Sequence, residues 1–260
     1  MNSRNIRLEI AYDGSGFSGW QKQPGIRTVQ GAVEKALSEV MDENTTLYGA
    51  SRTDAGVHAF GQSASFHTSS GIPTDRIPVA LNDRFDDIRV MLAEDVPDGF
   101  HARFDTVGKT YVYKVSHGAD TDIFDRLYIY SLKERLDTDK MRKVSGAIVG
   151  THDFAGFQSA GGQPRETTVR TVLDVSLSGE GNRIDIIVTG DGFLYNMVRI
   201  IVGTMIEAGL GRLSEEKAAL AVERADRRLA GPVAPAAGLY LQKVWYSEDE
   251  MKRGLAWTTK

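Results

Sequence analysis

In some segments of the chain apolar residues recur at every second position, which predicts a strand, and in others about every 3.6 residues, which predicts a helix. The order of strands and helices predicted in this way occurs twice along the chain. In the first half, this spacing predicts a strand at 6–12, a helix at 29–40, strands at 46–50 and 62–67, a helix at 74–85 and a strand at 88–92. Strand, helix, strand, strand, helix, strand is the order of a split βαβ unit.

The second half has the same order of elements but no convincing repeat of individual residues. Its predicted elements are a strand at 109–115, a helix at 138–149, a hairpin of 172–177 with 184–189, helices at 193–208 and 214–224, and a strand at 239–245. We therefore expect an α+β protein of two ferredoxin-like halves. Their strands would form a mostly antiparallel sheet with helices on one face, with an active-site cleft between the halves.

This order divides the chain into three parts. Residues 1–105 are expected to form the N-terminal α+β half, and residues 106–247 the C-terminal half. Residues 248–260 are rich in charge and are predicted to be a peripheral tail.

The composition excludes several kinds of chemistry. The chain has no cysteine, which removes disulfides, thiolate metal sites and a thiol nucleophile. Its five histidines form neither an HExxH nor an HxH pattern, so no catalytic metal is expected. No signal peptide and no apolar run of about 18 residues are visible, so a cytoplasmic protein that does not enter a membrane is expected.

The net charge of −4 argues weakly against a nucleic-acid partner, although a basic face on an acidic body remains open.

The segment SRTDAGVHA, from Ser51 to Ala59, is a polar loop between two predicted strands. Ala55 and Gly56 suit a tight turn. An aspartate at such a turn, here Asp54, commonly bonds to its own backbone, and this structural interpretation competes with a catalytic one.

Arg199 is predicted to lie in the middle of an almost wholly apolar helix. Such a helix is buried nearly all round, and an unpaired buried guanidinium costs several kcal/mol. Glu207 is one candidate partner, but about 12 Å separates the two positions along a helix axis. We therefore expect a carboxylate from another segment.

Several further blocks occur in a fixed order from about Ile6 to Tyr246. They are SGWQKQ (18–23), RTVQ (27–30), FHARF (100–104), KTYVY (109–113), DFAGF (153–157), FLYNMVRIIVG (193–203) and GLYL (238–241). Together with SRTDAGVHA, these blocks resemble those of the TruA-type tRNA pseudouridine synthases. One departure is Ser51, where the family usually has glycine, so a positive φ is not expected at this position.

The resemblance implies a role for individual residues. Asp54 matches the nucleophile, and Arg52 matches an arginine that helps to extrude the target nucleotide. Tyr111 matches the aromatic residue that packs on the flipped base, and Arg199 matches the basic partner of the aspartate. The expected RNA contacts are Phe100, His101, Arg103, Phe104 and Arg165.

The implied activity is the isomerisation of uridine to pseudouridine at positions 38 to 40 of the tRNA anticodon stem-loop. It uses a carboxylate nucleophile on a flipped-out base and needs neither a metal nor a small-molecule cofactor. The implied assembly is a homodimer, and the implied partner is tRNA.

Other interpretations of these residues stay open at this point. Tyr111 alternates with Tyr113 on one strand face and fits a core position, and Arg103 fits an arginine that snorkels from an apolar patch. His58 and His101 fit structural or RNA-contacting roles better than that of a general base.

Two other functions also remain: a non-catalytic RNA-binding module, and a glycoside hydrolase with two carboxylates.

Overall fold

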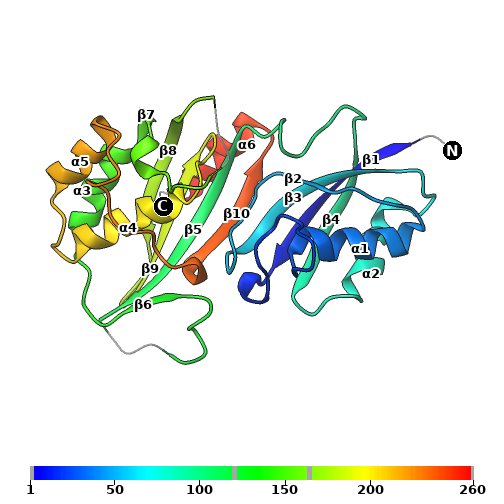
Figure 1. The fold of residues 1–260 in the computed structure, drawn as a ribbon, viewed down its shortest axis with the longest axis horizontal. Helices are drawn as coiled ribbons and strands as arrows, with labels where there is room; N and C mark the ends of the chain where they lie inside the picture. The colour runs from blue at the N-terminus through cyan, green and yellow to red at the C-terminus, as the bar shows by residue number, and fades with distance from the viewer. Residues whose placement is uncertain (1–2, 119–121, 163–165, 259–260) are drawn as a thin grey trace. The chain divides into compact units, whose positions relative to one another are not determined.

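The computed structural model describes residues 3–118, 122–162 and 166–258. These residues fall into two compact units, within the ranges Met1–Val107 with Tyr240–Tyr246 and Gly108–Leu239 with Ser247–Lys260 (Figure 1). Each unit combines helices with a mostly antiparallel sheet, so the expected mixed α+β class is confirmed.

The N-terminal unit is a sheet with two helices. Its elements are β1 (Arg4–Tyr12), α1 (Val29–Met41), β2 (Tyr48–Gly49), β3 (His58–Thr68), α2 (Ile77–Asn82), β4 (Ile88–Val96) and most of β10 (Leu239–Trp245). β1 pairs antiparallel with both β3 and β4, and β2 pairs antiparallel with β3. The order β4-β1-β3-β2 is that of a split βαβ unit. β10 joins β3 in parallel through Tyr240 and Leu241.

The core of this unit follows from its residue spacing. Ile6, Leu8 and Ile10 alternate along β1 and are fully buried, as are Val33 and Leu37 of α1. Helix α1 begins after Thr28, whose side chain accepts a hydrogen bond from Gly31 N, and it ends at the left-handed Asp42.

The C-terminal unit contains the other strands of the sheet and the remaining helices. Its elements are β5 (Gly108–His117), β6 (Tyr130–Leu132), α3 (Thr138–Ile148), β7 (Gly150–Asp153), β8 (Val169–Ser178), β9 (Arg183–Gly190), α4 (Met197–Gly209), α5 (Glu215–Glu223) and α6 (Glu248–Thr258). The strand order β5-β9-β8-β7 is antiparallel throughout, and β6 pairs in parallel with β5. Helix α3 contacts both α4 and α5.

Some elements differ from those predicted. The helix predicted at 193–208 begins only at Met197, because Asn196 has a left-handed backbone with a φ of 61°. The predicted tail contains α6, whose first turn is acidic and whose Met251 is buried. The predicted helix 74–85 is reduced to a 3-10 turn at Thr74–Arg76 followed by α2.

The division of the chain into domains that end at residues 105 and 247 stays a prediction. The compact units depart from it in two elements, because most of β10 belongs with β3 and α6 belongs to the C-terminal unit. Among the described residues, no helix is long and apolar enough to cross a membrane.

Candidate active site

The loop Ser51–Ala59 connects β2 to β3 and contains the predicted tight turn. Val57 N donates to Asp54 O at 3.2 Å, and Gly56 has a φ of 76°, which favours glycine. β3 begins within the loop, at His58. Asp54 is half-buried and Arg52 is exposed, whereas Thr53 between them is buried.

The first residue of this loop is held by one buried side chain. Ser51 N donates to Gln62 Oε1 at 3.2 Å, and Gln62 Nε2 donates to Ser51 O at 2.7 Å. Ser51 is not among the described residues with a positive φ, which confirms the expectation for this position. A serine therefore fits where the family usually has glycine.

The backbone around Asp54 is hydrogen-bonded to the segment Phe17–Trp20. Trp20 N donates to Thr53 O at 3.0 Å, and Gly56 N donates to Phe17 O at 3.3 Å. Gly19 makes this approach possible, because a Cβ there would lie 2.7 Å from Thr53 O and its φ is 87°. The chain on both sides of Asp54 is thus fixed before any substrate arrives.

His58 takes part in this framework. Gly14 N donates to its Nδ1 at 3.1 Å, and the carboxylate of Asp13 lies 3.2 Å from the same nitrogen. Its ring stacks on Tyr240 with the centroids 4.7 Å apart, and Tyr240 also stacks on Phe60 at 4.9 Å. The buried His58 therefore has a structural role in the described contacts.

Tyr111 lies on β5 in the C-terminal unit, where it pairs with Val188. Its ring meets Phe193 edge-to-face at 5.4 Å, and 7% of the residue is exposed. Tyr113 is two positions further along the same strand, and its hydroxyl donates to Pro235 O at 2.8 Å. Burial raises the pKa of the Tyr113 hydroxyl, with Tyr130 adding to the rise and Arg199 opposing it.

Arg199 is one of two residues of α4 that are not buried, the other being Glu207. Its Nε donates to Ala234 O at 2.7 Å, and its Nη1 donates to Asn196 Oδ1 at 2.8 Å. Glu207 instead forms an ion pair with Arg212 at 3.6 Å. Asp54 belongs to the N-terminal unit and Arg199 to the C-terminal unit, so the predicted ion pair between them stays a prediction.

Tyr48 and three residues of the segment FHARF form a group, which we call the FHARF cluster: Tyr48, His101, Arg103 and Phe104. Tyr48 and Phe104 are exposed, whereas His101 and Arg103 are half-buried. The rings of His101 and Phe104 lie 4.3 Å apart, and Tyr48 lies 5.1 Å from His101. Arg103 lies 5.4 Å from the centroid of the Phe104 ring, which is 72% exposed. Sequence reasoning missed Tyr48, although an aromatic residue beside the SRTDAGVHA loop was a visible signal.

Ala102 anchors the middle of this segment. Its N–H donates to Ser65 Oγ at 3.1 Å, and its carbonyl accepts from Tyr246 OH at 2.7 Å. The ring of Phe100 packs edge-on against Tyr246, with the centroids 5.0 Å apart. Arg165, the remaining predicted RNA contact, lies outside the described residues.

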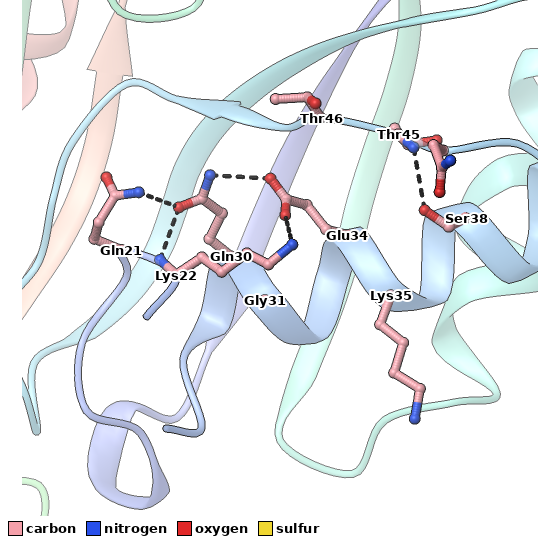
Figure 2. A pocket seen from close by; sticks show the side chains of 10 residues that line it. Gln21, Lys22, Gln30, Gly31, Glu34, Lys35, Ser38, Thr45 and Thr46 are labelled. Carbon is pink, nitrogen blue, oxygen red and sulfur yellow. Dashed lines mark hydrogen bonds and ion pairs between the residues drawn. The ribbon is translucent and has the colours of Figure 1, made fainter. Parts of the chain in front are cut away.

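A separate groove of about 600 Å³ runs beside α1 and is lined by residues between Gln21 and Thr46 (Figure 2). It contains none of the predicted site residues. Glu34 is buried, and its Oε1 accepts from Gln30 Nε2 and from Leu47 N, both at 3.0 Å. Lys22 Nζ lies 2.9 Å from Glu34 Oε2, so this network fixes the segment that follows Trp20.

No group of three or more histidine, aspartate or glutamate side chains suited to a metal ion occurs within the described ranges. The groups available for chemistry are the carboxylate of Asp54 in the N-terminal unit, and the ring of Tyr111 and the guanidinium of Arg199 in the C-terminal unit.

Known proteins resemble this chain along most of its length. The family model described as tRNA pseudouridine synthase matches residues 10–105 and 145–247. The tRNA pseudouridine synthase A 2 of Clostridium tetani is 47% identical, with 94% of this chain and 100% of the relative covered. The tRNA pseudouridine synthase A of Acetivibrio thermocellus is 44% identical over the same shares.

Solved structures are more distant. A chain of a Cbf5-Nop10-Gar1 complex aligns over 87% of this chain and 69% of that chain, with a TM-score of 0.34 and 11% identity.

The family match spans both the Asp54 loop and the start of α4. The chain belongs to the family of tRNA pseudouridine synthases, which are isomerases.

Proposed function

We propose that this protein converts uridine to pseudouridine in tRNA, with Asp54 as the nucleophile. The observation that carries the proposal is the carboxylate of Asp54 on a loop whose backbone is fixed by Trp20, Phe17 and Gln62, inside the matched range 10–105. A nucleophile held in this way needs little reorganisation when the substrate binds.

The reaction requires only protein side chains. The bond between C1′ and N1 of uracil breaks, C5 of the same base bonds to C1′, the hydrogen on C5 leaves as a proton, and N1 takes up a proton in its place. No electron is gained or lost overall, so no redox cofactor is needed. A carboxylate that attacks C1′ or C6 supplies the nucleophile.

Tyr111 and Arg199 have complementary roles in this proposal. Tyr111 offers a ring to the flipped base, and its edge-to-face contact with Phe193 holds that ring in place. Arg199 is the proposed basic partner of the Asp54 carboxylate. Arg52, which is exposed, contacts the phosphate or fills the space that the flipped nucleotide leaves.

The proposed substrates are the uridines at positions 38 to 40 of the anticodon stem-loop, and the proposed assembly is a cytoplasmic homodimer. The FHARF cluster supports an RNA substrate, because exposed rings stack on unpaired bases. The expected pair of ferredoxin-like halves with an active-site cleft belongs to the same proposal.

Tritium release from tRNA that carries 5-tritiated uridine tests the function. The wild-type protein is expected to release tritium, and Asp54→Asn is expected to release none while binding tRNA with little change. Asp86→Asn, at an exposed position of the same unit, is the control and is expected to keep full activity. Release by Asp54→Asn at the wild-type rate would refute the assignment of the nucleophile.

The alternative function is a non-catalytic RNA-binding module, which the FHARF cluster would also suit. The same assay separates the two functions, because such a module would bind tRNA and release no tritium.

A further inference from the structure

Asn196 has an unusual backbone for its place in the fold. Three non-glycine residues in the described part of the chain have a positive φ: Asp42, Asn196 and Ala225. Asp42 and Ala225 follow the ends of α1 and α5, where a left-handed residue is common. Asn196 instead immediately precedes α4, with a φ of 61° and a ψ of 8°. Asparagine tolerates this conformation better than most residues.

The side chain of Asn196 does not do what an asparagine at this place ordinarily does. At a helix start, the asparagine side chain commonly accepts a hydrogen bond from a backbone N–H of the first turn. Asn196 makes no such bond. Its Oδ1 accepts from Arg199 Nη1 at 2.8 Å, and its Nδ2 donates to Ser159 Oγ at 3.0 Å. The left-handed backbone thus accompanies a side chain that is bonded to a guanidinium.

A second group holds the same guanidinium at a different nitrogen. Arg199 Nε donates to Ala234 O at 2.7 Å, and Ala234 N donates to Arg199 O at 3.1 Å. The segment before Ala234 crosses α4 closely, because a Cβ on Gly203 would lie 1.9 Å from Pro232 O. Two hydrogen bonds at separate nitrogens therefore define the plane in which the guanidinium lies.

Residues 159–162 form a loop that contacts Asn196 and the residue before it. Ser159 N donates to Tyr195 O at 3.2 Å, so Ser159 is bonded to both Tyr195 and Asn196. A Cβ on Gly162 would lie 2.9 Å from Tyr195 Cβ, so the chain also passes closely there. Residues 159–162 therefore brace the start of α4.

We propose that Asn196 is a positioning residue, which orients the guanidinium of Arg199 for catalysis. The inference rests on the proposed function, in which Arg199 is the partner of the nucleophile Asp54. An arginine has several rotatable bonds, and a planar guanidinium must be aligned to bond a carboxylate or phosphate well. Asn196 supplies that alignment without contacting the substrate itself.

Asn196→Gly is the central variant, because glycine keeps the left-handed backbone and removes only the side chain. We expect kcat to fall about ten- to a hundredfold, because the guanidinium loses a hydrogen bond that orients it. The KM for tRNA should change by less than about twofold. Ser159→Ala should lower kcat in the same direction by a smaller factor. Ala225→Gly, at another left-handed position, is the matched control and should keep wild-type kinetics.

A spectroscopic measurement reports on the guanidinium without reference to activity. In wild-type protein, NMR of the arginine side chains should show slowly exchanging, separate Nη resonances for Arg199. These resonances should average in Asn196→Gly and stay separate in Ala225→Gly.

The outcomes separate the inference from the proposed function. If wild type and Ala225→Gly release no tritium, the proposed function fails, and the NMR measurement still decides whether Asn196 orders Arg199. If they are active and Asn196→Gly keeps its kcat within about twofold, the positioning role is wrong. A loss of kcat with unchanged Arg199 resonances would overturn it equally.

Discussion

The side-chain amide of Gln62 bonds both backbone polar groups of Ser51, eleven positions earlier in the chain. Gln62 is 0% exposed and Ser51 is also buried, so both bonds lie in the interior of the unit. The start of the Asp54 loop is therefore fixed by one residue of β3.

Replacing Gln62 by leucine should destabilise the protein, because Ser51 loses both bonds at a buried position. The expected loss of unfolding free energy is about 2–4 kcal/mol, measured by urea denaturation. Gln242→Leu, at an exposed position of β10, should change stability by less than about 0.5 kcal/mol. Equal stability of the two variants would show that the Gln62 bonds contribute little.

Asp54 and Arg199 are predicted to interact, and a double-mutant cycle tests this directly. Asp54→Asn, Arg199→Met and the double variant are compared by their free energies of unfolding. We expect a coupling energy of at least about 0.5 kcal/mol, because each single change leaves one charge without its partner. Strictly additive effects would mean that the two side chains do not form a pair.

Tyr111 has a packing role and a proposed substrate role, and two substitutions separate them. Tyr111→Phe keeps the ring that meets Phe193, so its ability to stack on a base should be close to wild type. Tyr111→Ala should cost about 3–5 kcal/mol of stability and also lower kcat at a temperature where it is folded. An Ala variant that is unstable yet fully active would leave only the packing role.

Phe104 is 72% exposed, and we expect it to stack on an RNA base. Phe104→Ala should weaken tRNA binding by about 1–3 kcal/mol, with little change in stability. Arg103→Gln should reduce the slope of log affinity against log salt by about one. Filter binding at several salt concentrations measures both effects. Phe124→Ala, at a ring that is 80% exposed, is the control, and an equal loss there would indicate a non-specific effect.

Tyr246 makes the N-terminal unit sensitive to alkaline pH. Burial raises the pKa of its hydroxyl from 10.0 to about 12, and hydrogen bonding to Ser63 opposes the rise. Because the pKa is higher in the folded state, the neutral hydroxyl stabilises the fold below pH 10, and this contribution is lost as the pH rises toward 12. Urea denaturation at pH 8 and pH 11 should show a smaller pH dependence for Tyr246→Phe than for wild type.

The sequence predicted the elements whose residue spacing repeats. Ile6, Leu8 and Ile10 identify β1, and the turn at Gly56 was visible in the polar loop. The true start of α4 was not visible, because the apolar spacing continues through Phe193 and Leu194 while the chain turns left-handed at Asn196. The bonds from Gln62 to Ser51 and from Asn196 to Arg199 were missed as well. Such bonds depend on where two segments meet, which periodicity does not record.

The close crossing at Gly203 extends the set of positions where a substitution should abolish activity. Any side chain there would push Pro232 away and carry with it the neighbouring Ala234 carbonyl, to which Arg199 Nε donates. In a screen of random variants, Gly203 should therefore score with the catalytic residues although it carries no functional group. A residue that keeps the catalytic side chains in place should therefore tolerate substitution as poorly as those side chains do.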